Sequence, residues 1–100
     1  MHRDTHFLKH GADFGASTAE EYEQMAEEFM FGERDKNTRE CTRPNHGQRI
    51  RFDFWSRRFG SAESAVSEHL RTFYRVRQAH IDYHGGENAY FGWECGRINV

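Results

Sequence analysis

Residues 49–54 read Arg-Ile-Arg-Phe-Asp-Phe, with charged and apolar side chains alternating at every position. Successive side chains of a β-strand point to opposite faces, so this period of two predicts a strand with one polar and one apolar face. Residues 70–76, Leu-Arg-Thr-Phe-Tyr-Arg-Val, are rich in aromatic and β-branched side chains and predict a second strand. Shorter strands are expected at 38–42, from Phe59 onward and at 89–93.

Upstream of these strands, residues 17–31 carry the clearest helical pattern. Ser17 and Thr18 are each followed three residues later by a glutamate, which is the capping-box arrangement of a helix start. Apolar side chains then recur at the i, i+3, i+4 and i+7 positions of one helix face, at Tyr22, Met25, Ala26 and Phe29. The prediction is an amphipathic helix that ends near Gly32.

A shorter helix is predicted at the N-terminus, from Asp4 or Thr5 to about His10, with Gly11 after its end. The order helix, helix, then several strands predicts an α+β fold. In this fold, two N-terminal helices pack on one face of a small antiparallel β-sheet of four to five strands. A length of 100 residues fits one domain, so the chain is expected to fold as a single unit over 1–100.

The composition excludes several classes of protein. Nine Phe, four Tyr and two Trp are more aromatic residues than a disordered chain carries. No apolar run is long enough for a membrane span, and no signal-peptide pattern is present, so no membrane partner is expected. Cys41 and Cys95 are the only cysteines. Two cysteines do not make a disulfide framework, which favours a reducing compartment, with a single Cys41–Cys95 bridge as the alternative.

The charge is distributed unevenly along the chain. The net charge of -2 argues against non-specific nucleic-acid binding. However, residues 19–40 are mainly acidic, whereas residues 43–77 are mainly basic and rich in aromatic side chains. This asymmetry is compatible with a binding face for an anionic partner, or with two charged surfaces that are simply solvated.

Seven histidines are present, and two of them lie on the predicted N-terminal helix. His6 and His10 are one turn apart on one face, and Lys9 lies on the adjoining flank. Two histidines at this spacing suit either a metal site or proton transfer near neutral pH. A metal site would need further ligands, which His80 and His84 with Cys95 could supply. The third interpretation is that these are ordinary polar residues of a helix.

The predicted strands supply groups for cleaving RNA without a metal. A neutral imidazole can take the proton of a ribose 2′-hydroxyl, and a second donor can protonate the departing 5′-oxygen. Cations can neutralise the charge that builds on the phosphate oxygens, and an aromatic side chain can stack on a base. The candidates are Arg49, Arg51, Arg71, Arg75, Thr72, Tyr74 and Trp55.

Three blocks of the sequence resemble a toxin module found at the C-termini of bacterial polymorphic and contact-dependent inhibition toxins. Residues 6–15 (HFLKHGADFG) are similar to its HFxKHGxEFG motif, and its S-x-x-E-Y and A-x-x-F patterns follow. Residues 49–53 (RIRFD), with Phe59-Gly60 after them, resemble its IxRYD…FG strand, and residues 70–74 (LRTFY) resemble its IRTFY strand. The resemblance covers residues 6–76, and 77–100 form a C-terminal extension.

The resemblance implies a fold of the barnase–EndoU–colicin–RelE group, whose members include ribonucleases that need neither a metal nor another cofactor. It implies that His10 is the leading catalytic histidine, with Lys9 beside it, and that His6 is either structural or catalytic. It also implies that Arg51 contacts phosphate and that Thr72 and Tyr74 complete the site.

The expected function is therefore that of an endoribonuclease toxin domain. It would cut RNA, with tRNA as a candidate target, and leave a 2′,3′-cyclic phosphate. It would act in the bacterial cytoplasm, either delivered from another cell or as a free-standing toxin, and an immunity or antitoxin protein would hold it in check. The alternative is a non-catalytic module of the same fold that binds protein or nucleic acid.

Overall fold

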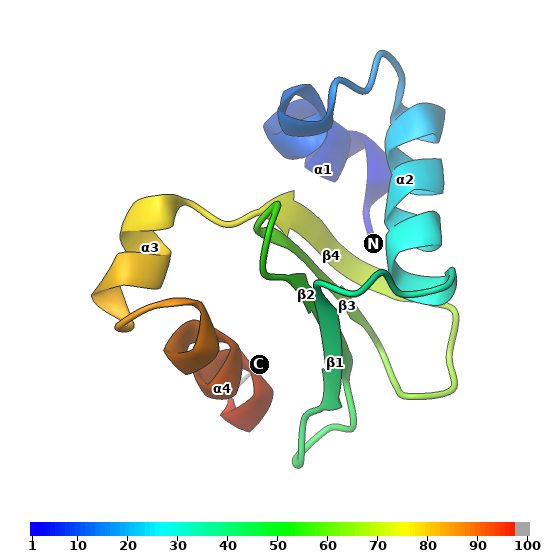
Figure 1. Ribbon diagram of the computed structural model, residues 1–100. Coiled ribbons are helices and arrows are strands. Elements are labelled where there is room, and N and C mark those ends of the chain that lie inside the picture. The colour runs from blue at the N-terminus through cyan, green and yellow to red at the C-terminus, as the bar shows by residue number, and fades with distance from the viewer. Residues whose placement is uncertain (98–100) are drawn as a thin grey trace.

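A four-stranded antiparallel sheet forms the centre of the protein, whose computed structural model describes residues 1–97. The strands are β1 (Thr38–Thr42), β2 (Arg49–Asp53), β3 (Arg58–Ala62) and β4 (Leu70–Arg75). Each strand pairs with its neighbour in sequence, so β1 and β4 are the two edges of the sheet (Figure 1). The predicted α+β class and all the predicted strands before residue 77 are confirmed. The strand that begins at Arg49 was expected to continue through Trp55, but it ends two residues earlier, at Asp53.

The N-terminal helical layer covers one face of this sheet. It consists of α1 (Arg3–His10), the 3-10 turn η1 (Gly11–Phe14) and α2 (Ala19–Phe31). The predicted cap of α2 is confirmed, because the Thr18 side chain accepts a hydrogen bond from the Glu21 backbone N–H at 3.1 Å. The prediction that the chain leaves the helical region at Gly11 is wrong, because the chain continues through η1 to Gly15. The φ of 68° at Gly15 is a left-handed value that glycine adopts without strain.

Close packing holds α2 on the sheet. Tyr22, Ala26 and Met30 are fully buried on the inner face of α2, and the Tyr22 hydroxyl donates a hydrogen bond to the Phe73 carbonyl of β4. Gly60 of β3 lies directly beneath the helix, where a Cβ atom would come within 2.6 Å of the Met30 sulfur. A glycine at this position therefore allows α2 to approach the strand closely.

A second helical layer covers the opposite face of the sheet. It consists of α3 (Gln78–Tyr83) and α4 (Glu87–Gly96), and Figure 1 shows the sheet lying between the two layers. The predictions of helices on one face only and of a strand at 89–93 are therefore wrong. The physical reason is the apolar side of β2, where Ile50 and Phe52 point away from α2 and are fully buried under Ile81 and Tyr90.

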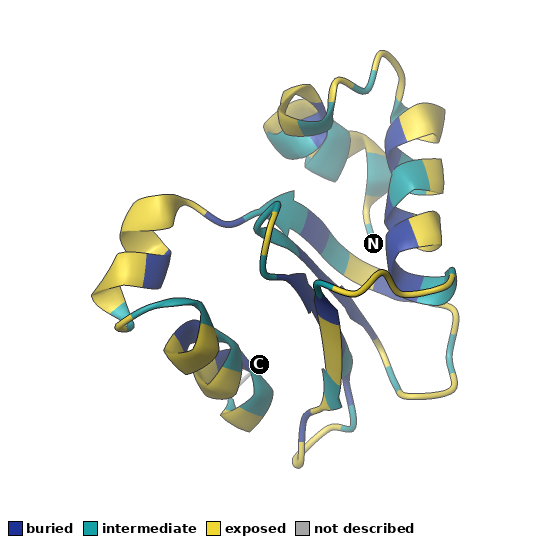
Figure 2. Cartoon of the chain, viewed as in Figure 1, coloured by how far each residue is buried: buried dark blue, intermediate teal, exposed yellow. Residues whose placement is uncertain are grey.

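Both faces of the inner strands are thus buried (Figure 2). The charged side of β2 faces the N-terminal layer, and Arg51 and Asp53 are only 6 % and 3 % exposed. The extension that follows residue 76 is, as far as Arg97, an integral part of the domain, because it covers the second core. The longest helix, α2, has 13 residues, and within residues 1–97 no helix is long and apolar enough to cross a membrane.

Cys41 of β1 and Cys95 of α4 form a disulfide, with their Cα atoms 6.0 Å apart. The expectation of two reduced cysteines is therefore wrong, and the alternative of a single bridge is the one observed. The bridge fastens the C-terminal helix to an edge strand across a sequence separation of 54 residues. Closing a loop of this length in the unfolded chain corresponds to about 4 kcal/mol of stabilisation in the chain-entropy account.

Candidate active site

A cavity lies where α1 meets the end of β4 and the start of α3. Its volume is about 500 Å³. In Figure 1, α1 and α3 flank the end of β4 from the two helical layers. The lining side chains are Lys9, His10, Asp13, Arg57, Tyr74, Arg75, Val76, Arg77 and His80. The cavity therefore brings together Lys9, His10, Tyr74 and Arg75, which come from sequence blocks some sixty residues apart.

This cavity is strongly basic. Lys9, Arg57, Arg75 and Arg77 are cations, two more lining residues are histidines, and Asp13 is the single carboxylate in the lining. Arg75 packs over the Phe14 ring with its guanidinium 5.5 Å from the ring centroid. Within residues 1–97 its buried Nε has no hydrogen-bond partner. Four cations around one cavity favour a phosphate-bearing ligand.

His10 is the last residue of α1, and its ring contributes to the wall of the cavity. Its ring centroid lies 5.4 Å from that of Tyr74. Burial lowers the pKa of His10; the Asp13 carboxylate works against this shift, and the Lys9 ammonium adds to it. The imidazole is therefore mainly neutral at neutral pH, which is the form that can accept a proton.

His6 lies behind His10 on the same face of α1, with 6.1 Å between the ring centroids. Burial lowers the pKa of His6, and the neighbouring His10 lowers it further. Its Nδ1 atom is buried and has no hydrogen-bond partner among residues 1–97. His6 does not line the cavity. The predicted pair is thus divided into one histidine at the site and one behind it.

Tyr74 contributes its ring to the cavity but not a free hydroxyl. Its hydroxyl forms a hydrogen bond with Tyr90, whose hydroxyl donates to the Glu94 carboxylate at 2.7 Å. Burial raises the pKa of Tyr74, and the nearby Glu94 carboxylate raises it further. Tyr74 therefore remains protonated and serves as a packing surface for His10.

Thr72 and Arg71, also predicted for the site, line a different and smaller cavity of about 290 Å³. The Thr72 hydroxyl hydrogen-bonds with that of Ser61 on β3 at 2.6 Å. Tyr74 lines this second cavity as well as the first. The two cavities are therefore neighbours along β4, with the Tyr74 side chain as a shared wall.

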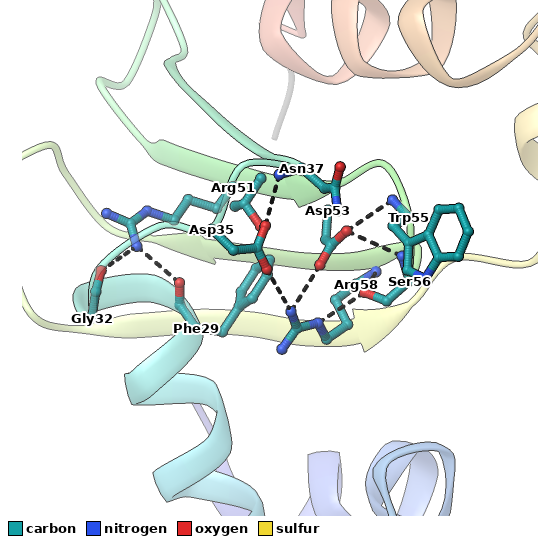
Figure 3. A network of polar contacts seen from close by, with 10 residues as sticks. Phe29, Gly32, Asp35, Asn37, Arg51, Asp53, Trp55, Ser56 and Arg58 are labelled. Carbon is teal, nitrogen blue, oxygen red and sulfur yellow. Dashed lines mark hydrogen bonds and ion pairs between the residues drawn. The ribbon is translucent and has the colours of Figure 1, made fainter.

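Arg51 lies outside both cavities and has a structural role in the fold. Its guanidinium donates to the carbonyls of Phe29 and Gly32 at the end of α2, at 3.0 Å and 2.7 Å (Figure 3). Its Nε also donates to Glu40 at 2.7 Å. These carbonyls are the ones that a helix end leaves without partners, so Arg51 caps α2. These contacts occupy the Nε and Nη1 atoms of Arg51. The phosphate contact that the resemblance implied for Arg51 stays a prediction.

Two further predicted residues also lie outside the cavities. Arg49 pairs with Glu40 at 2.7 Å and packs over the Phe31 ring. Trp55 is 85 % exposed at the turn between β2 and β3. The same turn is held by Asp53, which accepts hydrogen bonds from the backbone N–H groups of Trp55 and Ser56 (Figure 3). Neither Arg49 nor Trp55 lines the cavity around His10.

The histidines do not gather into a metal site in the described part of the chain. His80 and His84 are close to each other, with 3.2 Å between their Nε2 atoms, and the His84 ring packs on Trp93 at 4.2 Å. Cys95 is occupied in the disulfide. Among residues 1–97, no group of three or more His, Cys, Asp or Glu side chains is placed to hold a metal ion. The predicted convergence of two histidine pairs therefore does not occur within this range.

No protein-family model and no curated protein sequence matches this chain. The candidate site is therefore assigned from the positions of its own residues and not from those of a relative. The geometry of the site adds four polar lining residues that the sequence did not assign to an RNA site, namely Asp13, Arg57, Arg77 and His80. Arg57 carries a signal of its own, because its φ of 64° is unusual for a side-chain-bearing residue. Such backbone conformations are concentrated at functional sites.

Proposed function

We propose that this protein is a metal-independent endoribonuclease of the toxin type, with its active site in the cavity around His10. One observation carries the proposal: the mainly neutral imidazole of His10 lies in a cavity that is also lined by four cationic side chains and a single carboxylate. Cleavage of an RNA phosphodiester by the neighbouring ribose 2′-hydroxyl requires a proton acceptor with cations close to it, and the cavity supplies both. The resemblance of residues 6–15 to the toxin motif supports the same assignment.

In the proposed reaction, His10 removes the proton from the ribose 2′-hydroxyl as the 2′-oxygen attacks phosphorus. The bond between phosphorus and the 5′-oxygen breaks, and an acid returns a proton to that oxygen. The products are a 2′,3′-cyclic phosphate and a free 5′-hydroxyl. His80 is the candidate acid, because it lines the cavity from α3, on the opposite helical layer from His10. Lys9 and Arg75 neutralise the charge that develops on the phosphate oxygens.

The disulfide indicates which cellular compartments such a toxin would pass through. Disulfides form and persist in oxidising environments and are rare in the cytosol. The Cys41–Cys95 bridge therefore favours a chain that passes outside the cell, over one that stays in the cytoplasm that makes it. In this proposal the toxin is delivered to a bacterial cytoplasm, where it cuts RNA, and an immunity protein neutralises it in the producing cell.

The test is cleavage of a 5′-labelled RNA by the purified protein in the presence of EDTA. We expect fragments that end in a 2′,3′-cyclic phosphate, and a loss of about 10²- to 10⁴-fold in rate for His10→Ala. The control is His69→Ala, which removes an exposed histidine from the loop between β3 and β4. Undiminished cleavage by His10→Ala would refute the assignment. RNA binding without cleavage by the wild-type protein would instead support the non-catalytic binding module.

A further inference from the structure

We propose that the second cavity binds another phosphate of the same RNA strand, so that the substrate is a single-stranded polynucleotide lying along β4. This inference rests on the proposed ribonuclease function. The second cavity is lined by Arg43, Phe59, Ser61, Arg71, Thr72, Tyr74 and Arg97. It combines arginines, hydroxyls and aromatic rings, which are the groups that hold the backbone and bases of unpaired RNA.

The charges in this cavity leave a surplus of cations. Arg43 is 6 % exposed and is neutralised by Glu94, to which its guanidinium donates at 2.7 Å. Arg97 shares the same Glu94 oxygen at 3.0 Å but remains partly exposed. Arg71 is exposed, and within residues 1–97 it forms neither an ion pair nor a side-chain hydrogen bond. Among residues 1–97, the Glu94 carboxylate pairs with two of the three arginines that line this cavity, and Arg71 is the group most available to an anion.

Among residues 1–97, the hydroxyls of Ser61 and Thr72 add a further hydrogen-bond donor to the second cavity. Ser61 and Thr72 carry one hydroxyl proton each, and their oxygens are 2.6 Å apart. Only one of the two protons is used in the bond between them. The other O–H can donate to a phosphate oxygen, next to the guanidinium of Arg71.

The position of β4 gives the strand a continuous path between the cavities. β4 is an edge of the sheet, and Tyr74 lines both cavities. Thr72 belongs to the second cavity and Val76 to the first, and four residues of extended chain span about 13 Å. This distance exceeds the reach of a single phosphate group, so the two cavities are suited to different phosphates of one strand.

The experiment measures binding of RNA that cannot be cleaved. Fully 2′-O-methylated RNA lacks the attacking hydroxyl, and its binding can be followed by fluorescence anisotropy. A hexanucleotide can occupy both cavities, whereas a dinucleotide, with one phosphodiester, can occupy only one. For Arg71→Ala we expect about 5- to 10-fold weaker hexanucleotide binding and unchanged dinucleotide binding. The salt dependence of hexanucleotide binding should also fall, by about 0.7 in the slope of log K against log salt.

Arg39→Ala is the matched control, because it removes an exposed arginine from β1, the opposite edge of the sheet. It should leave the affinities for both RNAs within twofold of the wild type. Equal loss of dinucleotide and hexanucleotide binding in Arg71→Ala, or no loss of either, would overturn the second subsite. A separate experiment tests the ribonuclease proposal. If the His10→Ala variant still cleaves unmodified RNA at the wild-type rate, that proposal fails whatever the binding data show.

Discussion

The imidazole of His10 packs against the phenol ring of Tyr74, with 5.4 Å between the ring centroids. This contact connects the two helical layers through the sheet. Tyr74 is anchored on the far side by the hydrogen bond of its hydroxyl with Tyr90, which in turn binds Glu94 on α4. The position of the proposed base therefore depends on packing against a residue that the C-terminal helices hold in place.

The Tyr74 contact can be tested by separating the ring from the hydroxyl. Tyr74→Ala removes the surface that supports His10, and misplacing a catalytic group by about 1 Å costs about 10²-fold in rate. We expect that loss in kcat/KM for RNA cleavage. Tyr74→Phe keeps the ring and should stay within about threefold of the wild type. A loss in Tyr74→Phe as large as that in Tyr74→Ala would show that the hydroxyl itself takes part in the reaction.

The pH dependence of cleavage should report the lowered pKa of His10. A general base acts in its neutral form, and the pKa of His10 lies below its ordinary value of 6.5 because of burial. On the acidic side, the value of kcat/KM should therefore rise with pH, with the midpoint of the rise below pH 6.5. At higher pH it should fall again as the general acid loses its proton. Asp13→Asn removes the carboxylate that raises this pKa and should move the midpoint lower still. A shift to higher pH in this variant would contradict the assignment of the rising limb to His10.

Arg51 and Arg49 make a matched pair, because both donate to the same oxygen of Glu40. Arg51 is buried and also caps α2, so Arg51→Ala removes several charge-assisted hydrogen bonds. We expect a loss of about 3–5 kcal/mol in the free energy of unfolding, measured with urea. Arg49→Ala breaks a more accessible pair and should cost less than about 1 kcal/mol. Both variants should retain the wild-type kcat/KM under conditions where they are folded, whereas a phosphate-binding Arg51 would lose activity.

The strands and α2 could be predicted because each carries its own local signal. Alternation over 49–54 and the helical spacing from Tyr22 to Phe29 are properties of short segments, and both were confirmed. The C-terminal helices lack such a signal. Residues 89–93 are aromatic and suit a strand locally, but they form part of α4, where Tyr90 and Glu94 are buried one turn apart. Their conformation follows from the need to cover Ile50 and Phe52, which is a tertiary demand.

The candidate site was predictable only in part, for the same reason. The histidines, Lys9 and Tyr74 were identified from residue chemistry and spacing, and the fold places His10, Lys9 and Tyr74 around one cavity. Arg51 was indistinguishable in sequence from a ligand-binding arginine, because its role depends on where the end of α2 lies. His80 and Arg77 were missed as RNA-site residues because the turn into α3, which returns the chain to His10, has no sequence signature.

Asp53 should make a pH-dependent contribution to stability. Burial alone would raise the pKa of Asp53, but hydrogen bonds from Arg58 and from the backbone N–H groups of Ser56 and Trp55 outweigh it and lower the pKa. A carboxyl with a lowered folded pKa stabilises the protein above its unfolded value of 3.8 and loses that effect as the pH falls through the folded pKa.

Asp53→Asn should therefore cost about 2–3 kcal/mol in urea unfolding at pH 7 and much less near pH 2.5. The control is Glu68→Gln, an exposed carboxyl in the loop between β3 and β4 that should change stability little at either pH. If Asp53→Asn were equally destabilising at both values, the effect would come from packing of the turn and not from the charge.

The Cys41–Cys95 bridge offers a last test, which links stability to the second cavity. The bridge fastens α4 to β1, and α4 carries Glu94, which holds Arg43 and Arg97 at that cavity. Cys41→Ser with Cys95→Ser should lower the free energy of unfolding by about 2–4 kcal/mol. A reducing agent should lower the thermal midpoint of the wild type and leave that of the double variant unchanged. In the folded double variant, we expect a larger loss of hexanucleotide binding than of dinucleotide binding. Glu94 of α4 holds Arg43 and Arg97 at the second cavity directly, whereas α4 supports the first cavity indirectly, through the contact of Tyr90 with Tyr74. Unchanged binding of both RNAs would show that the core around Tyr90 positions α4 without the bridge.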